Sequence, residues 1–533
     1  MARVMFALIP SLLTSNAERL RATWLSNVPK DLVSGLVVAL ALIPEAIAFS
    51  IIAGVAPQVG LYASFSIAVI TAIFGGRPAM ISAATAAVAV LFKQITSLEG
   101  ISQDQALDLI FAATIIAGLL QVLAGFLRLG SLMRFVSRSV VIGFVNALAI
   151  LIFLAQVGAV AKAMGWDLHH WQANGLENQT TWLTFAFIAL ALAILYLLPQ
   201  AARRVTEIIP VPLIAIIVLT ALSLALPGET RWTVSDEGQL PEGLPFFIWL
   251  DWHLVWQHLS LVLTVAVSVA LVGLLESLMT ATIVEDATDT PTERNRECMG
   301  QGVANFATGF LGGMAGCAMI GQSIINVTSG GRTRLSTFVA GLFLLILVVF
   351  LGDLVGLIPM AALVAIMIMI SIATFNWDSL KTLPTNPRTS SAVMLATVLI
   401  TVATENLAYG VFTGVLLSGV FFAWKIASLF DAHRQDTDGK RVYTLEGQLF
   451  FATVERLNEA LHFNNAPPYV VIDVSKAHIW DLTAINALDK AVLKYRRAGA
   501  EVSVIGLNRA SKTLVARLSE ADKPGAMERL LAH

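Results

Sequence analysis

The chain contains a long succession of apolar segments, and this feature limits the folds it can adopt. About 20 apolar residues are enough for a helix to cross a bilayer. Inside lipid, the backbone polar groups must be satisfied within the protein. Only 13% of the 533 residues are charged, about half of the ~25% that is usual for soluble chains. The sequence therefore predicts an all-α membrane protein that crosses the bilayer many times.

Fourteen spans are predicted between residues 31 and 430. They are residues 31–52, 58–75, 79–95, 106–127, 133–161, 181–199, 207–226, 256–284, 299–312, 317–329, 335–352, 355–374, 390–404 and 407–430. The third and tenth are short and contain small or polar residues, so each is a candidate half-helix.

The stretch Pro44–Val90 combines strong hydrophobicity with features that interrupt helices. Glu45 follows a proline in the middle of a predicted span, and Gly75-Gly76 is followed by a run of small residues, Ser82 to Ala86. Proline and small residues in such segments favour broken helices, whose free backbone groups can face a cavity. We expect the rest of the chain to pack around this stretch and a second one like it.

The second stretch runs from Leu274 to Asn326. Phe310 to Gly313 matches Ile73 to Gly76, and the small or polar run Met319 to Ser323 follows it. Glu276 lies upstream, as Glu45 does in the first stretch. Seven spans separate the matching elements, and this odd number would insert the two halves with opposite orientations. The pattern predicts an inverted repeat with a binding site at the bilayer midplane.

Two half-helices from opposite repeats would point their amino-terminal ends at each other. Their unpaired N–H groups and positive dipole ends favour an anion between them. The residues near these ends are Ala84, Thr85, Gly321 and Gln322. Small residues let an anion approach the backbone, and Thr85 and Gln322 can donate hydrogen bonds.

The charges in the loops predict the orientation. Lysine and arginine collect before the first span and after each even-numbered span from the fourth onwards, whereas the loop 227–251 holds five acidic residues and one arginine. Because positive charge marks cytoplasmic loops, both termini are expected in the cytoplasm. Residues 1–30 show no cleavage site of a signal peptide, and a bacterial inner (plasma) membrane is the expected location.

The composition changes after Phe430. Residues 431–440 (DAHRQDTDGK) are a polar segment that we expect to be a linker. Residues 441–533 then alternate strand and helix patterns, which is typical of a small α/β domain. The expected domains are a cytoplasmic segment 1–30, a transmembrane domain 31–430, the linker 431–440 and the α/β domain 441–533.

Several motifs together resemble the sulfate permease family (SulP). They are IPEAIAFSIIAGVAPQVGLYAS with FGG and AATAAVAV, LLESLMTA, NRECMGQGVANFATGFLGG, INVTSGGRTRLS and, at the C-terminus, VVIDVSKAHIWDLTAINALD, which resembles a STAS domain. The resemblance implies fourteen spans in two inverted repeats of seven, divided into core and gate domains. It also implies a cytoplasmic STAS domain, a homodimer and the movement of anions.

The resemblance also assigns roles to single residues. Phe49 matches an aromatic residue that lines the anion pocket, and Glu276 matches a frequent acidic residue. Glu45 stands where many members have glutamine, and Gln322 where many animal members have arginine. A sodium site of some relatives would need an aspartate and a threonine, where this chain has Glu276 and Ile320.

Each of these residues also has a structural interpretation. Glu45 can be a hydrogen-bonding partner of the opposite half-helix, and Glu276 can pair with the backbone or with Thr280. Phe49 can be a packing residue, and Thr85 and Gln322 can be polar contacts between helices. An acid inside a bilayer is costly and usually lines a pathway, so Glu45 and Glu276 are our candidates for ion coupling.

Other candidates receive weaker interpretations. Trp166, His169, His170 and Trp171 are expected to form an interfacial cluster rather than a metal site. Thr483 occupies the place where STAS relatives present a phosphorylatable hydroxyl, with a role in the first turn of a helix as the alternative. The two cysteines, Cys298 and Cys317, are expected to be inert.

The sequence thus predicts a secondary active transporter of a small anion with an elevator-like motion. Sulfate is the family default, and bicarbonate and C4-dicarboxylates remain open; protons are favoured over sodium as the coupling ion. The alternative is a membrane anchor that displays a STAS domain for signalling. No enzyme, cofactor, metal or nucleic-acid partner is expected, since the net charge is −2 and no catalytic or metal-ligand cluster is present in the sequence.

Overall fold

The computed structural model describes residues 21, 23–131, 136–163, 179–202, 211–225, 232–237, 240, 243–437, 439–524 and 526. The chain forms two compact units, which divide between Val415 and Leu416. The predicted interfacial cluster of Trp166, His169, His170 and Trp171 lies outside the described residues.

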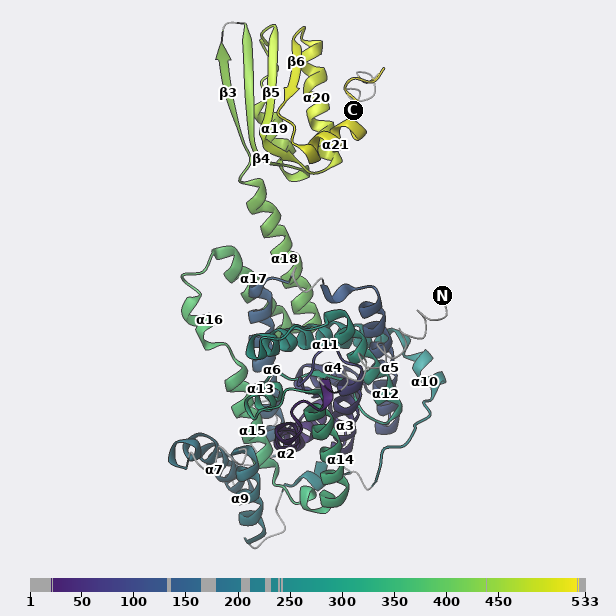
Figure 1. Ribbon diagram of the computed structural model, residues 1–533. Helices are drawn as coiled ribbons and strands as arrows, with labels where there is room; N and C mark the ends of the chain where they lie inside the picture. The colour runs from purple at the N-terminus through teal and green to yellow at the C-terminus, as the bar shows by residue number, and fades with distance from the viewer. Residues whose placement is uncertain are drawn as a thin grey trace, which may run out of the picture. The chain divides into compact units, whose positions relative to one another are not determined.

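The first unit is built from helices (Figure 1). Its helices are α2 (Val28–Ala53), α3 (Pro57–Phe74), α4 (Ala86–Thr96), α5 (Gln103–Phe126), α6 (Arg138–Ala163), α7 (Gln179–Ala201), α9 (Val211–Ala225), α10 (Trp252–Gln257), α11 (Leu259–Thr288), α12 (Arg294–Phe310), α13 (Ile320–Thr328), α14 (Arg334–Gly356), α15 (Met360–Thr374), α16 (Trp377–Thr382), α17 (Arg388–Thr404) and α18 (Leu407–Ala427), with a 3₁₀ turn η2 (Val234–Glu237). Helix α18 continues into the second unit.

Each predicted span coincides with at least one helix of the described chain. Among the described residues, nine helices are long and apolar enough to cross a membrane, and α4, α9 and α17 are shorter apolar helices. The apolar composition and the length of these helices confirm a polytopic helical fold, while the number of fourteen crossings stays a prediction.

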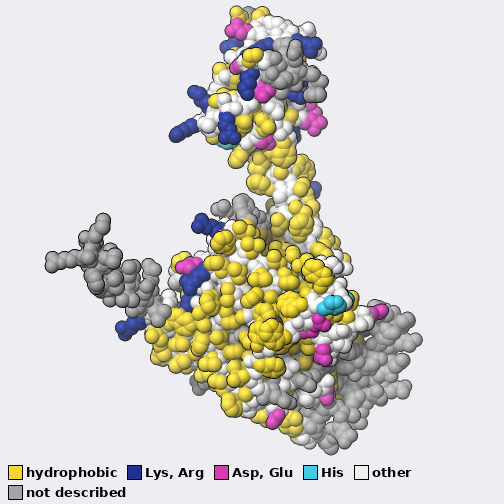
Figure 2. Space-filling model, turned by 90° about the vertical axis from the view of Figure 1, so that its right-hand side faces the viewer, with side chains coloured by type: hydrophobic (Ala, Val, Ile, Leu, Met, Phe, Trp, Pro, Cys, Tyr) yellow, Lys and Arg dark blue, Asp and Glu magenta, His cyan; other side chains and the backbone are white. Residues whose placement is uncertain are grey.

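The surface of this unit is also suited to lipid. The face shown in Figure 2 carries a broad, nearly continuous layer of hydrophobic side chains, and charged side chains lie mainly at its edges. On α5, for example, Leu119, Leu123 and Phe126 are all more than half exposed. Such a large apolar surface is rare on soluble monomers, so the unit is built to be surrounded by acyl chains.

The packing of the helices separates two groups. Helices α2, α3, α4, α5, α11, α12, α13 and α14 pack mainly against one another, and α6, α7, α9, α15 and α17 form a second set of neighbours. Only a few pairs join the groups, among them α2 with α15 and α4 with α6. We call the first group the core and the second the gate.

Two short strands cross in the middle of the core. Strand β1 (Ser82–Ala84) pairs antiparallel with β2 (Gly316–Ala318), and α4 and α13 follow directly after them. The third and tenth predicted spans are therefore half-helices preceded by extended chain, as expected. The antiparallel pairing is the arrangement that two repeats of opposite orientation require.

One expected interruption is absent. Pro44 lies inside α2, which is nevertheless continuous over 26 residues. The proline removes one helical N–H, and the neighbouring turns hold the helix together. The chain instead breaks after Gly75 and Leu311, where α3 and α12 end before the two strands.

The second unit contains a four-stranded sheet in the order β3-β4-β5-β6 (Figure 1). The strands are β3 (Asp431–Thr437), β4 (Lys440–Leu449), β5 (Tyr469–Ile479) and β6 (Glu501–Ile505), and the helical elements are η3 (Phe451–Thr453), α19 (Val454–Ala460), α20 (Leu482–Arg497) and α21 (Arg509–Leu518). Strands β4, β5 and β6 are parallel. Helix α20 packs on β5 and β6 around a core that includes Tyr443, Ile472 and Tyr495.

The expected linker 431–440 holds strand β3 instead. This strand pairs antiparallel with β4 from Asp431 to Thr437. Hydrogen bonds from Arg434 and Arg441 join Asp436 to both strands and lower the pKa of its carboxyl below the usual range. The polar composition suggested a loop because β3 is an exposed edge strand, whose side chains need not be apolar.

The crossing of the two strands gives a testable prediction. A Cβ added to Gly316 would lie 2.0 Å from the carbonyl oxygen of Ala83, so Gly316→Ala must push the strands apart. Overpacking usually costs about 1–3 kcal/mol, and we expect a clear fall in the melting temperature in detergent. Gly158→Ala is the matched control, because nothing lies within 4 Å of its added Cβ. Equal melting temperatures for the two variants would contradict the prediction.

Candidate functional site

The starts of α4 and α13 lie at opposite ends of the β1–β2 ladder. Ala84 pairs with Gly316 and Ser82 with Ala318, so the ladder itself is roughly 7 Å long, from a strand rise of about 3.4 Å per residue. The two helices begin beyond its opposite ends. Thr85 and Met319 precede the helices, and neither side chain caps the first turn. The amide groups of both first turns therefore lack the usual side-chain acceptor.

Side chains of neighbouring helices fix the crossing. Asn305 of α12 accepts a hydrogen bond from the Gly316 amide (2.9 Å) and donates one to the Gly316 carbonyl (3.0 Å). The Ser277 hydroxyl of α11 accepts from the Ala318 amide at 3.1 Å, and Ser64 of α3 accepts from the Ala84 amide at 3.3 Å. The backbone polar groups of the extended segments are therefore hydrogen-bonded, although the segments lie in an apolar interior.

The Glu45 carboxylate lies beside the start of α13. The side-chain amide of Gln322, in the first turn of α13, donates a hydrogen bond to it. Both side chains are buried, and Phe49, one turn further along α2, is 3% exposed. The predicted residues Glu45 and Gln322 thus come together, from positions 277 residues apart in the sequence.

The second buried carboxyl has a partner that the sequence analysis missed. The thiol of Cys317 in β2 donates a hydrogen bond to Glu276 at 2.9 Å. The same sulfur lies 3.1 Å from the hydroxyl of Thr85. The sequence analysis expected Cys317 to be inert and did not foresee these hydrogen bonds. Its position between Gly312-Gly313 and the half-helix α13 was the available signal.

Thr280 does not pair with the Glu276 carboxylate. Its hydroxyl donates to the backbone carbonyls of Glu276 (2.9 Å) and Ala318 (3.3 Å). Thr280 therefore holds α11 against β2 and leaves the carboxylate to Cys317.

The two helix starts differ in exposure. Ala84 and Thr85 are buried, whereas Gly321 is exposed and nothing lies within 4 Å of a Cβ added to it. The four residues predicted to line an anion site thus all lie at the helix starts. The start of α13 is the open side of this site.

Two buried arginines of the helical unit bond to the carboxyl-terminal ends of helices and not to the starts of α4 and α13. Arg77 donates to the Val284 and Thr290 carbonyls (3.2 and 2.6 Å) at the end of α11. Arg334 donates to the Ala72 and Gly75 carbonyls (2.8 and 2.6 Å) at the end of α3. Such contacts stabilise carboxyl-terminal helix ends. Within the described part of the chain, an anion at the site would bind neutral N–H and O–H donors.

A third buried acid, Glu297, was not singled out from the sequence. It accepts hydrogen bonds from the amides of Gly76 and Arg77 at 2.7 and 3.0 Å and from Gln301 at 2.8 Å. Glu297 thus holds the chain break after α3 against α12. Its partners are all fixed by the fold, so its role is architectural.

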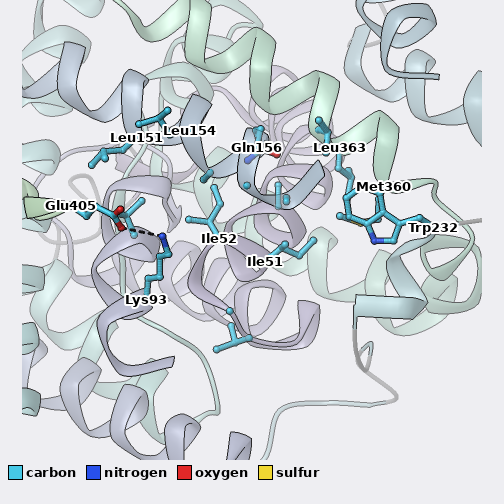
Figure 3. A pocket seen from close by; sticks show the side chains of 18 of the residues that line it. Ile51, Ile52, Lys93, Leu151, Leu154, Gln156, Trp232, Met360, Leu363 and Glu405 are labelled. Carbon is cyan, nitrogen blue, oxygen red and sulfur yellow. Dashed lines mark hydrogen bonds and ion pairs between the residues drawn. The ribbon is translucent and has the colours of Figure 1, made fainter. Parts of the chain in front are cut away.

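A cavity of about 560 Å³ lies between core and gate, and its lining includes none of the residues predicted to bind the anion. Figure 3 shows its lining, to which the core contributes Ile51 and Ile52 of α2 and the gate Leu151 and Leu154 of α6. Lys93, in the last turn of α4, points toward Glu405 at the end of α17 and forms an ion pair with it at 3.0 Å. Both side chains are more than half exposed, so this ion pair joins core and gate at a place that water can reach.

Thr483 lies in the first turn of α20 and is exposed. Asp481, two residues earlier, caps the helix, because its side chain accepts a hydrogen bond from the Ala484 amide at 2.8 Å. Both interpretations of Thr483, as a phosphorylation site and as a residue of the first helical turn, fit this position.

Comparisons with known proteins agree with these units. Residues 28–421 match the model of the Sulfate permease family, and residues 431–528 match that of the STAS domain. A Bacillus subtilis (strain 168) protein named "Putative sulfate transporter YbaR" is 47% identical over 505 residues, which cover 95% of this chain and 100% of that protein.

More distant relatives extend the comparison. "Bicarbonate transporter BicA" of Picosynechococcus sp. is 25% identical, over 90% of this chain and 89% of that protein. The overall structure of SLC26A9 superimposes with a TM-score of 0.78 at 17% identity, covering 99% of this chain and 91% of that one. The latter likeness confirms the fold, with a helical membrane unit and a C-terminal STAS domain.

The contact between Gln322 and Glu45 gives a second prediction. Removing the donor leaves a buried carboxyl without its partner, which usually costs about 1–3 kcal/mol. We therefore expect Gln322→Met to lower the melting temperature in detergent. Adding Glu45→Met to that variant should recover most of the loss, because no polar group is then left unpaired. A double variant that melts lower still would show that the two side chains do not depend on each other.

Proposed function

The chain belongs to the sulfate permease family, and we propose that it is a secondary active transporter that carries a small anion across a bacterial plasma membrane. The observation that carries this proposal is the pair of uncapped helix starts at the two ends of the β1–β2 ladder. Free N–H groups and helix dipoles at such ends favour negative charge.

The residues around the helix starts define the proposed anion site. Ala84, Thr85 and Gly321 would let an anion approach the backbone amides, Gln322 would turn its amide toward it, and Phe49 would close the apolar side. Because the donors are neutral, the site would bind an anion without a fixed positive charge. Sulfate is our first candidate, since the relative YbaR carries the name of a sulfate transporter.

Bicarbonate is the second candidate substrate. It rests on the relative BicA, which is named a bicarbonate transporter. C4-dicarboxylates remain a third class, because the cavity between core and gate is larger than an inorganic anion requires.

Proton coupling follows from the two buried carboxyls, Glu45 and Glu276. An ionised carboxylate beside an incoming anion repels it strongly in a poorly solvated site. Taking up a proton removes this repulsion, so that proton and anion would bind together. Sodium is less suitable, because the side chain of Ile320 has no oxygen atom to offer such an ion.

The division into core and gate supports an elevator-like motion. The contacts between the two groups are few, and the cavity and the exposed Lys93–Glu405 pair lie at their boundary. In this proposal the core, with the anion at the helix starts, slides against the gate. We further propose fourteen crossings, both termini in the cytoplasm, and a homodimer.

Uptake of radiolabelled anions into proteoliposomes tests the proposed function. Sulfate, bicarbonate and succinate should be compared with and without an inward proton gradient. We expect one of them to accumulate in a way that depends on the gradient and that a protonophore abolishes. If none enters faster than into protein-free liposomes, the chain is not a transporter of these anions.

The signalling alternative rests on the exposed Thr483 at the start of α20. Removing residues 431–533 separates the two functions, because β3 begins at Asp431. A transporter should retain anion binding by its membrane unit, whereas a display anchor should show no anion binding in either form.

The role of Glu45 gives a third prediction. Glu45→Gln keeps a hydrogen-bonding partner for Gln322 but cannot exchange a proton, so uptake should increase less as the external pH falls, and Glu276 should carry the remainder. The measurement is the ratio of initial uptake rates at pH 6 and pH 8, which should be clearly smaller than in the wild type. Glu99→Gln is the control, since Glu99 is exposed. An unchanged ratio in Glu45→Gln would exclude Glu45 as the coupling acid.

The sliding motion gives a fourth prediction. In the variant Lys93→Cys/Glu405→Cys, a short bifunctional reagent that forms a mixed disulfide with each thiol should join core to gate. Two long side chains span the gap in the native pair, so a reagent fits better than a direct disulfide. We expect cross-linking to block uptake and a reductant to restore it, while each single variant treated alike keeps its uptake. Full uptake by the cross-linked protein would refute the elevator-like motion.

A further inference from the structure

Three buried side chains from three elements form a continuous hydrogen-bonded chain. Thr85 precedes α4, Cys317 lies in the middle of β2, and Glu276 lies on α11. The sulfur is 3.1 Å from the Thr85 hydroxyl and 2.9 Å from a Glu276 carboxylate oxygen. Cys317 is fully buried, and the other two residues are less than a tenth exposed. Water therefore does not compete for these bonds.

The direction of the bonds follows from the charge of Glu276. An ionised carboxylate only accepts hydrogen bonds, and a thiol has a single hydrogen to donate. Cys317 must then donate to Glu276, and Thr85 must donate to the sulfur. The hydroxyl hydrogen of Thr85 is consequently directed away from the start of α4.

Protonation of Glu276 allows the opposite direction. A protonated carboxyl can donate to the sulfur, and the thiol can then donate to the oxygen of Thr85. No covalent bond of the thiol or the hydroxyl breaks, since both groups only rotate. The O–H of Thr85 is released and can point at an anion above the first turn of α4.

We propose that Cys317 is a positioning residue that couples the protonation of Glu276 to the hydrogen-bond donor at the anion site. The inference rests on the proposed function and deepens it, because it assigns the proton link to a thiol between the two repeats. Linkage is reciprocal: an anion that accepts from Thr85 favours the protonated form of Glu276, and the proton favours anion binding.

No other titratable group among the described contacts bonds to Glu276. The elements packed against α11 are α4, α5, α10, α12, α13 and β2. Their titratable or charged side chains other than Cys317 are Lys93, Asp104, Asp108, His253, Arg294, Arg296, Glu297 and Cys298. Lys93 pairs with Glu405 and Glu297 with Gln301 and backbone amides. Glu45, on α2, is held by Gln322.

Binding of radiolabelled sulfate to the purified full chain, measured between pH 8.5 and 5.5, tests the proposal. Bicarbonate and succinate serve as parallel probes. A hydrogen bond to a charged group is worth about 1.5–3 kcal/mol, so the wild type should bind about tenfold more tightly at the lower pH. Cys317→Ala breaks the chain, and its affinity should change over this range only by the part that Glu45 contributes. In Cys317→Ala/Glu45→Gln the change should be less than twofold.

Two further variants separate a relay from a merely structural role. Cys317→Ser keeps one donor and one acceptor at this position and should retain the pH dependence. In Glu276→Gln the amide donates to the sulfur at every pH, so binding should be tight and should lose the part of its pH dependence that passes through Cys317. If Cys317→Ala does not fold, the comparison of Cys317→Ser with Glu276→Gln still decides the question.

A spectroscopic measurement reports on the thiol directly. The chain has two cysteines, so Cys298→Ala leaves a single S–H stretching band. Its frequency should rise as the pH falls, because a thiol donates a weaker hydrogen bond to a hydroxyl than to a carboxylate. A band that does not move would overturn the relay.

The outcomes distinguish this inference from the proposed function. A pH dependence in Cys317→Ala as large as in the wild type, or wild-type binding that does not depend on pH, would overturn the relay and leave anion transport intact. If the wild type binds none of the three anions at any pH, both proposals fail together.

Discussion

The structure depends on the mutual hydrogen bonding of two backbone segments inside an apolar interior. A chain that leaves its helix in such a place exposes N–H and C=O groups that cost several kcal/mol each when unpaired. Strands β1 and β2 break their helices at the same depth and satisfy each other. Little space remains where the two strands cross. A Cβ added to Gly316 would collide with the Ala83 carbonyl, and the side-chain amide of Asn305 bonds to the N–H and the C=O of Gly316.

The proposed chemistry follows from this pairing. Because the strands are antiparallel, the helices that follow them begin at opposite ends of the ladder, and their first amides remain available. The same pairing places Cys317 between Thr85 and Glu276, so that the two halves of the chain share a hydrogen-bonded path. The donors, the acids and the thiol are thus held by one small element rather than by a large pocket.

Much of this fold could be predicted from the sequence, because hydropathy reports directly on lipid-facing helices and small residues report on close backbone approach. The half-helices were predicted for that reason, and α20 begins and ends where its amphipathic pattern does.

Contacts between distant residues were harder to foresee. A buried cysteine that packs and one that donates a hydrogen bond look alike in a sequence, so Cys317 was missed. Strand β3 was missed because an edge strand can be as polar as a loop, and Pro44 misled because neighbouring turns can support a helix across a missing bond.

The bridge between Lys93 and Glu405 has a consequence for the setting in which the protein works. Its two side chains are 57% and 60% exposed, and ion pairs of this kind contribute about 0–1 kcal/mol and weaken as dissolved ions screen them. Low ionic strength would therefore strengthen this ion pair, and high ionic strength would weaken it. In the proposed sliding motion, the balance between the positions of core and gate would accordingly depend in part on the salinity of the surroundings.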